Sequence, residues 1–288
     1  MLTLLAPAKI NLTLEVLAKR QDGFHEIRSV IQAINLCDIL HFKPHDKVNI
    51  TSPAPGWIAE ESLVYKAVIL LQNITGCTRG VNIKVEKHIP LVSGLGGDSS
   101  DAAAVLRGLN QLWGLGLSGK ELLELAPQLG SDVSFFLYGG TALMEGRGEI
   151  ITPLPLLPQR WVVLVMPSVP REEGKTKRLY NSLKKSHFTD GQITARLVDR
   201  LKTGGEFTPS LLFNTFENVT FTGTSGLGVY QRHIMKVGAP HVYLAGSGPA
   251  MFTLLESSAE AEDLYTRLRN QDMECYVTDT GTEITPAD

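Results

Sequence analysis

Polar and apolar side chains alternate from Lys9 to Val16, which is typical of a strand that is buried on one face. Successive side chains of a strand point to opposite faces, so alternate residues share a face. The apolar face comprises Ile10, Leu12, Leu14 and Val16. The polar face carries Lys9 and Asn11, and both reach the same ligand if that face lines a cleft. The alternative is a strand face that is simply solvated.

Similar patterns continue along the chain and predict an α+β protein. Strands are predicted at residues 38–42, 48–51, 81–85, 141–144, 149–151, 161–166, 242–245, 250–254 and 274–278. Helices are predicted at residues 59–73, 118–130, 176–185, 192–202, 214–220 and 228–237. A last helix is predicted after Ser257, and Ser118 with Glu121 forms the pattern of a capping box. Asp22-Gly23 indicates a turn.

The segment 90–104 joins a predicted strand to a predicted helix and is rich in glycine and serine. The helix is indicated by apolar residues at helical spacing, namely Ala102, Val105, Leu106, Leu109, Leu112 and Trp113. The start of a helix has backbone N–H groups without partners and a partial positive charge. Glycines before it let the backbone approach a ligand closely. The segment therefore predicts a phosphate-binding loop.

Two common phosphate loops do not fit this segment. A P-loop requires a lysine directly after its last glycine, and Asp98 follows Gly97. A dinucleotide-binding loop requires Gly-x-Gly-x-x-Gly, and the corresponding run from Gly94 ends in Ser99. The remaining alternative is a glycine-rich helix start that binds nothing, and the length of the ordered motif argues against it.

Length and composition limit the remaining possibilities. The 288 residues suggest two domains, and the proline-dense segment 152–158 places them at residues 1–155 and 156–288. The net charge of −3 argues against a nucleic-acid partner. The three cysteines are widely spaced and indicate neither a zinc site nor a disulfide framework. With no signal peptide and no apolar run of membrane length, we expect a soluble, cytoplasmic protein without a membrane partner.

The order Pro-x-x-x-Gly-Leu-Gly-x-x-Ser-Ser-x-Ala from Pro90 to Ala102 resembles the phosphate loop of the GHMP kinases, named for galactokinase, homoserine kinase, mevalonate kinase and phosphomevalonate kinase. The resemblance implies an N-terminal domain like the second domain of ribosomal protein S5 and a C-terminal α+β sandwich. ATP would bind with the substrate in the cleft between them. The residues that would surround ATP are Pro90, Leu91, Val92, Ser93, Gly94, Leu95, Gly96, Gly97, Asp98, Ser99 and Ser100.

Other motifs resemble one family within this superfamily, the 4-diphosphocytidyl-2-C-methyl-D-erythritol kinases. The matching segments are residues 7–12, 20–25, 130–136, 214–217 and 245–249. The resemblance runs from residue 7 to about residue 256, and Gly-Phe-His at residues 23–25 is its most specific part. It implies transfer of the ATP γ-phosphate, with Mg²⁺, to the C2 hydroxyl of a methylerythritol unit that carries CDP at its other end. The implied pathway is non-mevalonate isoprenoid precursor biosynthesis.

The resemblance also assigns two catalytic residues. Asp132 matches the aspartate that accepts or orients the proton of the attacking hydroxyl. Lys9 matches the lysine that polarises this hydroxyl and keeps the aspartate ionised. Taken by itself, an aspartate before apolar residues is more often a helix cap.

For the CDP end of the substrate, the resemblance implies that His25 and Phe24 bind and stack the cytosine, with Asn11 also near the substrate. Tyr180 occupies the position of a second aromatic over the cytosine, and packing within a helix is an equal alternative. Ser99 or Ser100 would face Mg²⁺. The sequence does not specify the full set of metal ligands or the oligomeric state.

The chain departs from the family at several positions. Asp98 replaces the third consecutive glycine of the loop, and Val92-Ser93 replaces a Gly-Ala pair. A carboxylate about 4 Å from a phosphate would cost about 4 kcal/mol per charge pair at an effective dielectric constant of about 20. Asp98 must therefore point away, cap the helix or lie beside Mg²⁺, and we expect the cap because it precedes Ser99 at the helix start. Ser134 and Lys175-Thr176 depart from the pattern nearer the substrate.

Two other functions stay open at this point. The first is a GHMP kinase with another acceptor, such as homoserine or mevalonate, which Gly23-Phe24-His25 disfavours because such acceptors carry no base. The second is a nucleotide-binding homologue that has lost catalysis. Asp98 supports that alternative, and the presence of both Lys9 and Asp132 argues against it.

Overall fold

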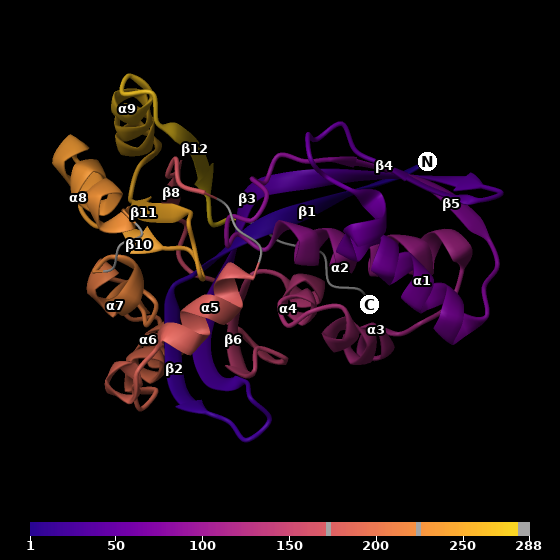
Figure 1. Ribbon diagram of the computed structural model, residues 1–288, viewed down its shortest axis with the longest axis horizontal. Helices are drawn as coiled ribbons and strands as arrows, with labels where there is room; N and C mark the ends of the chain where they lie inside the picture. Colours follow the sequence, from indigo (N-terminus) through magenta and orange to yellow (C-terminus); the bar gives the residue numbers. More distant parts are fainter. Residues whose placement is uncertain (171–173, 223–225, 282–288) are drawn as a thin grey trace.

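The computed structural model describes residues 1–170, 174–222 and 226–281 and has the mixed α+β composition that the sequence predicts (Figure 1). The strands are β1 (Leu2–Asn11), β2 (Thr13–Lys19), β3 (His25–His45), β4 (Val48–Thr51), β5 (Gly80–Glu86), β6 (Thr141–Gly146), β7 (Ile150–Leu154), β8 (Trp161–Met166), β9 (Phe213–Asn214), β10 (Tyr243–Leu244), β11 (Met251–Leu255) and β12 (Glu274–Asp279). The helices are α1 (Leu63–Thr75), α2 (Gly97–Trp113), α3 (Gly119–Leu125), α4 (Val133–Tyr138), α5 (Lys175–Ser182), α6 (Gln192–Thr203), α7 (Glu217–Thr220), α8 (Leu227–Val237) and α9 (Ser258–Arg269). None of these helices is long and apolar enough to cross a membrane.

The larger sheet has eight strands and is organised around β3. This strand of 21 residues pairs antiparallel with β1, β2, β5 and β6 along different parts of its length. The predicted strand at residues 38–42 is the second half of β3 and not a separate element. Helix α2 packs on β1 and against α1, and in Figure 1 both helices lie beside the end of the sheet that carries β4 and β5.

The smaller sheet has four strands in the order β10-β11-β8-β12, with α9 packed against β8 and β12. The predicted pairing of the strands on either side of residues 246–249 is confirmed, because β10 and β11 are antiparallel. In Figure 1 this sheet and helices α8 and α9 lie at the end of the molecule opposite to β4 and β5.

The two halves of the chain share the larger sheet. Strand β9, from the second half, pairs parallel with β2, so that Thr13 and Leu14 lie beside Phe213 and Asn214. Strand β7 extends into the proline-dense segment that was expected to be a connector. The division into residues 1–155 and 156–288 stays a prediction, and residues 282–288 lie outside the described part of the chain.

The expectation of one half-buried strand from Lys9 to Val16 is wrong in two respects. The segment is divided at Leu12 between β1 and β2, and its polar face is as buried as its apolar face. Lys9 and Asn11 are each 5% exposed, and Glu15 is fully buried. Most of their polar atoms have protein partners: Lys9 and Asn11 are hydrogen-bonded, and Oε2 of Glu15 accepts the Thr194 N–H at 2.6 Å, whereas Oε1 of Glu15 is buried without a hydrogen-bond partner among the described residues. Pairing of this kind lets a polar strand face be buried at low cost.

Several predicted helix ends also differ. The capping box at Ser118 is confirmed, and so is the start of the last helix after Ser257, which forms a second capping box. The helix expected from residue 59, in contrast, begins at Leu63, after a single 3₁₀ turn. The segment 214–220 is not one helix, because its first residue belongs to β9 and only α7 is helical. The Phe213 N–H donates to the Leu12 carbonyl at 3.1 Å, a contact between distant segments that overrides the local preference.

Gly108 tests how closely α2 packs on the large sheet. A Cβ at this position would lie 2.9 Å from the Phe42 ring and 3.2 Å from the Leu4 side chain. Helix propensity favours Gly108→Ala by about 1 kcal/mol, but we expect overpacking to prevail and lower the free energy of unfolding by about 1–3 kcal/mol. Denaturant unfolding measures this value. Gln111→Ala, on the exposed face of the same helix, is the control and should change stability by less than about 0.5 kcal/mol; a stabilised Gly108→Ala would contradict the packing.

Candidate active site

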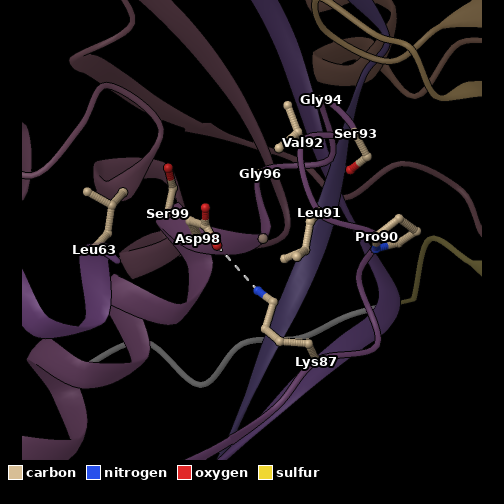
Figure 2. A pocket seen from close by; sticks show the side chains of 11 residues that line it. Leu63, Lys87, Pro90, Leu91, Val92, Ser93, Gly94, Gly96, Asp98 and Ser99 are labelled. Carbon is tan, nitrogen blue, oxygen red and sulfur yellow. Dashed lines mark hydrogen bonds and ion pairs between the residues drawn. The ribbon is translucent and has the colours of Figure 1, made fainter. Parts of the chain in front are cut away.

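The predicted phosphate loop surrounds a pocket of about 280 Å³ at the start of α2 (Figure 2). Its lining residues are Leu63, Lys87, Pro90, Leu91, Val92, Ser93, Gly94, Gly96, Gly97, Asp98 and Ser99. Of the predicted loop residues, only Leu95 and Ser100 do not line it, and both side chains are buried. Leu63 and Lys87 are additions that the sequence analysis missed, because they lie outside the glycine-rich motif.

Helix α2 begins at Gly97, and Gly96 is its N-cap with a left-handed backbone. A Cβ at Gly96 would lie 2.8 Å from the Phe136 ring and 3.1 Å from Cγ of Lys9. Glycine at this position therefore permits both the positive φ and the close approach of β1 and α4 to the loop. The first turn of α2 lies at the edge of this pocket, and the N–H groups at a helix start are suited to bind an anion.

The prediction that Asp98 caps α2 is wrong. The cap is Gly96, no side chain makes a capping hydrogen bond, and Asp98 is the second residue of the helix. Its carboxylate lies 3.5 Å from Nζ of Lys87, and its side chain is 55% exposed. Figure 2 shows the two side chains pointing toward one another across the pocket wall. Asp98 therefore brings a negative charge to the rim of the pocket, and Lys87 partly offsets it.

Lys87 is a buried cation with three carboxylate neighbours. Its Nζ lies 2.6 Å from Asp38 and 2.7 Å from Asp101, and both of these side chains are fully buried. Burial lowers the pKa of Lys87, but Asp101, Asp38 and Asp98 outweigh it, so the net shift is upward. Burial raises the pKa of Asp101, and the charge of Lys87 opposes this rise. The cluster fixes the end of β5 to β3 and to the first turns of α2, and so shapes the pocket.

The structure brings together the two predicted catalytic residues. Nζ of Lys9 lies 3.6 Å from the Asp132 carboxylate, with Lys9 almost completely buried and Asp132 partly exposed. Asp132 stands at the N-cap position of α4 but makes no capping hydrogen bond, so its carboxylate is available to Lys9. The backbone N–H of Lys9 donates to the Leu95 carbonyl at 2.9 Å, and this bond holds the Lys9–Asp132 pair against the phosphate loop.

Asn11 completes the polar group around Lys9. Lys9 donates through Nζ to Oδ1 of Asn11 at 2.8 Å, and Asn11 donates through Nδ2 to the Ser29 hydroxyl at 2.9 Å. The amide oxygen of Asn11 and the carboxylate of Asp132 thus fix the position of the ammonium group. A carboxylate and an ammonium group placed like those of Asp132 and Lys9 can orient a hydroxyl group and receive its proton beside a bound phosphate.

The aromatic residues form a second part of the site. The rings of His25 and Tyr180 are stacked, with centroids 4.9 Å apart and planes inclined by 19°, and Phe188 lies edge-on to His25. Burial, with a smaller contribution from Lys19, lowers the pKa of His25. Burial raises the pKa of Tyr180, and the charge of Asp132 adds to the rise, so the aromatic group lies within electrostatic range of the Lys9–Asp132 pair.

The predicted aromatic residues are only partly brought together. His25 and Tyr180 are already in contact, so a base cannot lie between their rings unless one of them moves. Phe24 is 54% exposed, and its ring lies 4.7 Å from the Arg147 guanidinium. Among the described residues, no ring contact joins Phe24 to His25 or Tyr180. Phe188 was missed, because a lone phenylalanine carries no signal of a site.

Comparison with known proteins agrees with this geometry. Residues 62–140 match the family described as GHMP kinases N terminal domain. A 4-diphosphocytidyl-2-C-methyl-D-erythritol kinase of Dehalococcoides mccartyi is 50% identical over 97% of this chain and 98% of its own length. The enzyme of that name from Listeria innocua is 38% identical over 96% of this chain and 95% of its own length.

Solved structures give the same result. A crystal structure of a 4-(cytidine 5'-diphospho)-2C-methyl-D-erythritol kinase superposes with a TM-score of 0.83 and 32% identity, covering 98% of this chain and 100% of that chain. Homoserine kinase from Cytophaga hutchinsonii superposes with a TM-score of 0.73 at 22% identity, covering 97% of this chain and 94% of that one, which shows the shared fold alone. The glycine-rich loop and the two sheets agree with the sequence identity to these kinases, which extends over nearly the full length of the chain. The chain therefore belongs to the 4-diphosphocytidyl-2-C-methyl-D-erythritol kinase family of the GHMP kinases.

Proposed function

We propose that this chain transfers the γ-phosphate of ATP to the C2 hydroxyl of 4-diphosphocytidyl-2-C-methyl-D-erythritol, in non-mevalonate isoprenoid precursor biosynthesis. The observation that carries the proposal is that the Lys9–Asp132 pair is held against the phosphate loop by the hydrogen bond from Lys9 to Leu95. A relative named as a kinase of this substrate is 50% identical to the chain, which supports the proposal. The cytoplasmic location stays a prediction.

In this proposal the pocket at the start of α2 holds the triphosphate of ATP. The N–H groups of the loop and of the first helical turn would bind its oxygens, and the partial positive charge of the helix start would stabilise them. The glycines keep the loop free of side chains that would block the phosphates. Phosphoryl transfer then requires alignment and charge stabilisation more than covalent chemistry from the protein.

Lys9 and Asp132 would act on the acceptor hydroxyl. Asp132 is partly exposed and so can reach a substrate, whereas Lys9 is buried behind it. The carboxylate would orient the hydroxyl and receive its proton as the new O–P bond forms and the bond between the γ-phosphorus and the bridging oxygen of ADP breaks. The Lys9 ammonium would keep Asp132 ionised and stabilise the developing charge.

Mg²⁺ fits the donor set of the pocket as an ion held mainly by nucleotide phosphates. Among the described residues, no three His, Cys, Asp or Glu side chains converge as a metal site. The pocket lining does contain the Ser99 hydroxyl, an oxygen donor of the kind that Mg²⁺ prefers. Ser100 is buried and does not line the pocket, so Ser99 is the better candidate. Bound there, the ion would neutralise charge on the transferred phosphoryl group.

The aromatic group around His25 would bind the cytosine of the acceptor. Stacking suits this group because His25 and Tyr180 present flat rings. Since the two rings touch, the base would stack on an outer face of the pair or would enter after Tyr180 moves. Asn11, one residue from the break between β1 and β2, would lie near the sugar-like part of the substrate.

A coupled assay with ATP, Mg²⁺ and 4-diphosphocytidyl-2-C-methyl-D-erythritol tests the proposal, with the product identified by phosphorus NMR. Homoserine and mevalonate, tested as acceptors under the same conditions, address the alternative of another GHMP kinase. We expect turnover with the CDP-linked acceptor alone and competition by CDP. Turnover of homoserine or mevalonate without competition by CDP would contradict the proposal, as would nucleotide binding without any turnover.

The role of Asp132 is tested by Asp132→Asn, which keeps the shape of the side chain and removes the base. We expect kcat to fall by at least about 10²-fold, while ATP affinity changes little because the phosphate pocket is untouched. Steady-state kinetics and ATP titration measure the two effects. Asp263→Asn, on the exposed surface of α9, is the control and should behave as wild type; turnover of Asp132→Asn near that of the control would remove Asp132 from the mechanism.

The assignment of the two pockets is tested by His25→Ala. We expect the KM for the cytidine substrate to rise about tenfold, in the range for loss of one stacked aromatic, and the KM for ATP to stay nearly constant. His233→Ala, at an exposed position of α8, is the matched control. If the KM for ATP rises and that for the cytidine substrate does not, the two pockets are reversed.

The charge of Asp98 is tested by Asp98→Gly and by the isosteric Asp98→Asn. Because Asp98 is not the helix cap and its carboxylate lies on the pocket wall, both changes should tighten ATP binding several-fold at low salt. The gain should shrink at high salt, since ions screen an exposed charge. Titration of ATP at two salt concentrations measures this. If both variants instead need more Mg²⁺ than wild type, Asp98 serves the metal ion and the repulsion hypothesis fails.

A further inference from the structure

We propose that Asn214 is a positioning residue for this phosphoryl transfer, because it fixes the turn at residues 245–248 against the ammonium group of Lys9. The inference rests on the proposed function and concerns the same site. Asn214 touches neither predicted pocket, so the role assigned to it is to act through Lys9.

The side chain of Asn214 is fully engaged with backbone groups. It is 2% exposed, and Nδ2 donates to the Leu244 carbonyl at 2.9 Å and to the Gly246 carbonyl at 2.8 Å. Oδ1 accepts the Phe216 N–H at 3.0 Å. Both amide hydrogens are therefore used on the two carbonyls that flank the start of the turn. Both carbonyls belong to a segment at least 30 residues further along the chain. The Asn214 amide therefore joins two distant segments.

Asn214 is itself held beside β2, the strand that follows β1 and its Lys9. On either side of Asn214, the Phe213 N–H donates to the Leu12 carbonyl at 3.1 Å, and the Thr215 N–H donates to the Leu14 carbonyl at 2.8 Å. Leu12 directly follows Asn11 in the chain. Asn214 thus joins β2, which continues from the strand of Lys9 after the break at Leu12, to the turn that faces Lys9.

The turn lies directly on Lys9. Gly246 has a φ of 57°, and a Cβ there would lie 3.0 Å from Nζ of Lys9 and 3.4 Å from Oδ1 of Asn11. The same turn contacts the phosphate loop, because a Cβ at Gly94 would lie 2.4 Å from the Ala245 carbonyl oxygen. The turn therefore forms one wall around the ammonium group and one side of the phosphate loop at once.

Neighbours of Asn214 support the same arrangement. The Glu217 carboxylate accepts the Leu244 N–H at 2.8 Å and holds the strand that enters the turn, and burial raises the pKa of Glu217 to about 7. The Phe216 ring lies edge-on to Tyr180, with centroids 4.9 Å apart. Residues 213–217 therefore contact the wall behind Lys9 on one side and the aromatic group on the other.

The loss of the two amide donors should affect turnover more than binding. Without Asn214 the Gly246 carbonyl loses its anchor, and the turn can move away from Lys9. Displacements of about 1 Å at a reacting group cost up to about 10²-fold in rate. We expect kcat of Asn214→Ala to fall about 10- to 100-fold, while the KM values for ATP and for the CDP-linked acceptor change by less than about threefold.

The matched control is Asn218→Ala. Asn218, in the adjacent helix α7, also donates its amide to a backbone carbonyl, but this carbonyl belongs to Thr215, at 3.1 Å, and not to the turn. This variant should lose stability and keep wild-type kcat. Thermal unfolding of both variants separates a loss of stability from a loss of rate.

A double-mutant cycle with Lys9→Met identifies the route of the effect. If Asn214 acts through Lys9, adding Asn214→Ala to Lys9→Met should lower the single-turnover rate by no more than about twofold, because the group that it positions is gone. An undiminished loss in the Lys9→Met background would overturn the inference. So would an Asn214→Ala enzyme as active as Asn218→Ala.

Gly246→Ala provides a second variant if Asn214→Ala does not fold. It places a methyl group against Lys9 from the turn itself, and we expect a fall in kcat of similar size that is also absent in the Lys9→Met background. An unchanged kcat would overturn the inference. A wild-type chain that does not phosphorylate the CDP-linked acceptor would overturn the proposed function together with this inference, whereas an active wild type beside an unaffected Asn214→Ala overturns this inference alone.

Discussion

The structure depends on the close approach of three backbone segments around the side chain of Lys9. The phosphate loop, the turn at residues 245–248 and strand β1 meet there, although they are far apart in the sequence. At Gly94, Gly96 and Gly246 a single added carbon would lie 3.0 Å or less from a neighbouring segment. Close packing of this kind has few alternative arrangements, so the ammonium group occupies one defined position.

Buried charge sets the second constraint on the site. Lys9 and Lys87 are both almost inaccessible, and each is surrounded by oxygen atoms from several elements. Removing an ammonium group from water costs several kcal/mol, which only well-placed partners offset. The groups around Lys9 include the amide of Asn11, whereas Lys87 has three carboxylates. The ammonium group of Lys9 thus lies beside the partly exposed Asp132, whereas the charge of Lys87 holds the pocket wall.

The sequence predicted those features that are determined locally. The glycine-rich loop followed by a helix, the capping box at Ser118 and most strands follow from short sequence patterns, and the proximity of Lys9 and Asp132 followed from family resemblance. Prediction from the sequence failed for features that depend on contacts between residues far apart in the chain. Asp98 was taken as the helix cap although α2 begins one residue earlier and uses Gly96. A two-residue strand such as β9, the burial of Lys87 and the contact of His25 with Tyr180 leave no local pattern.

Strand β9 has a consequence for the order in which the chain can fold during synthesis. It adds to the edge of β2 although about 200 residues separate the two strands. Pairings of such high sequence separation form late, because the entropy of closing a long loop opposes them until other contacts exist. The first half of the chain can collapse around its own core as it leaves the ribosome. Its β2 edge stays unpaired until residue 214 has been translated, and over that interval the nascent enzyme presents an open strand to its surroundings.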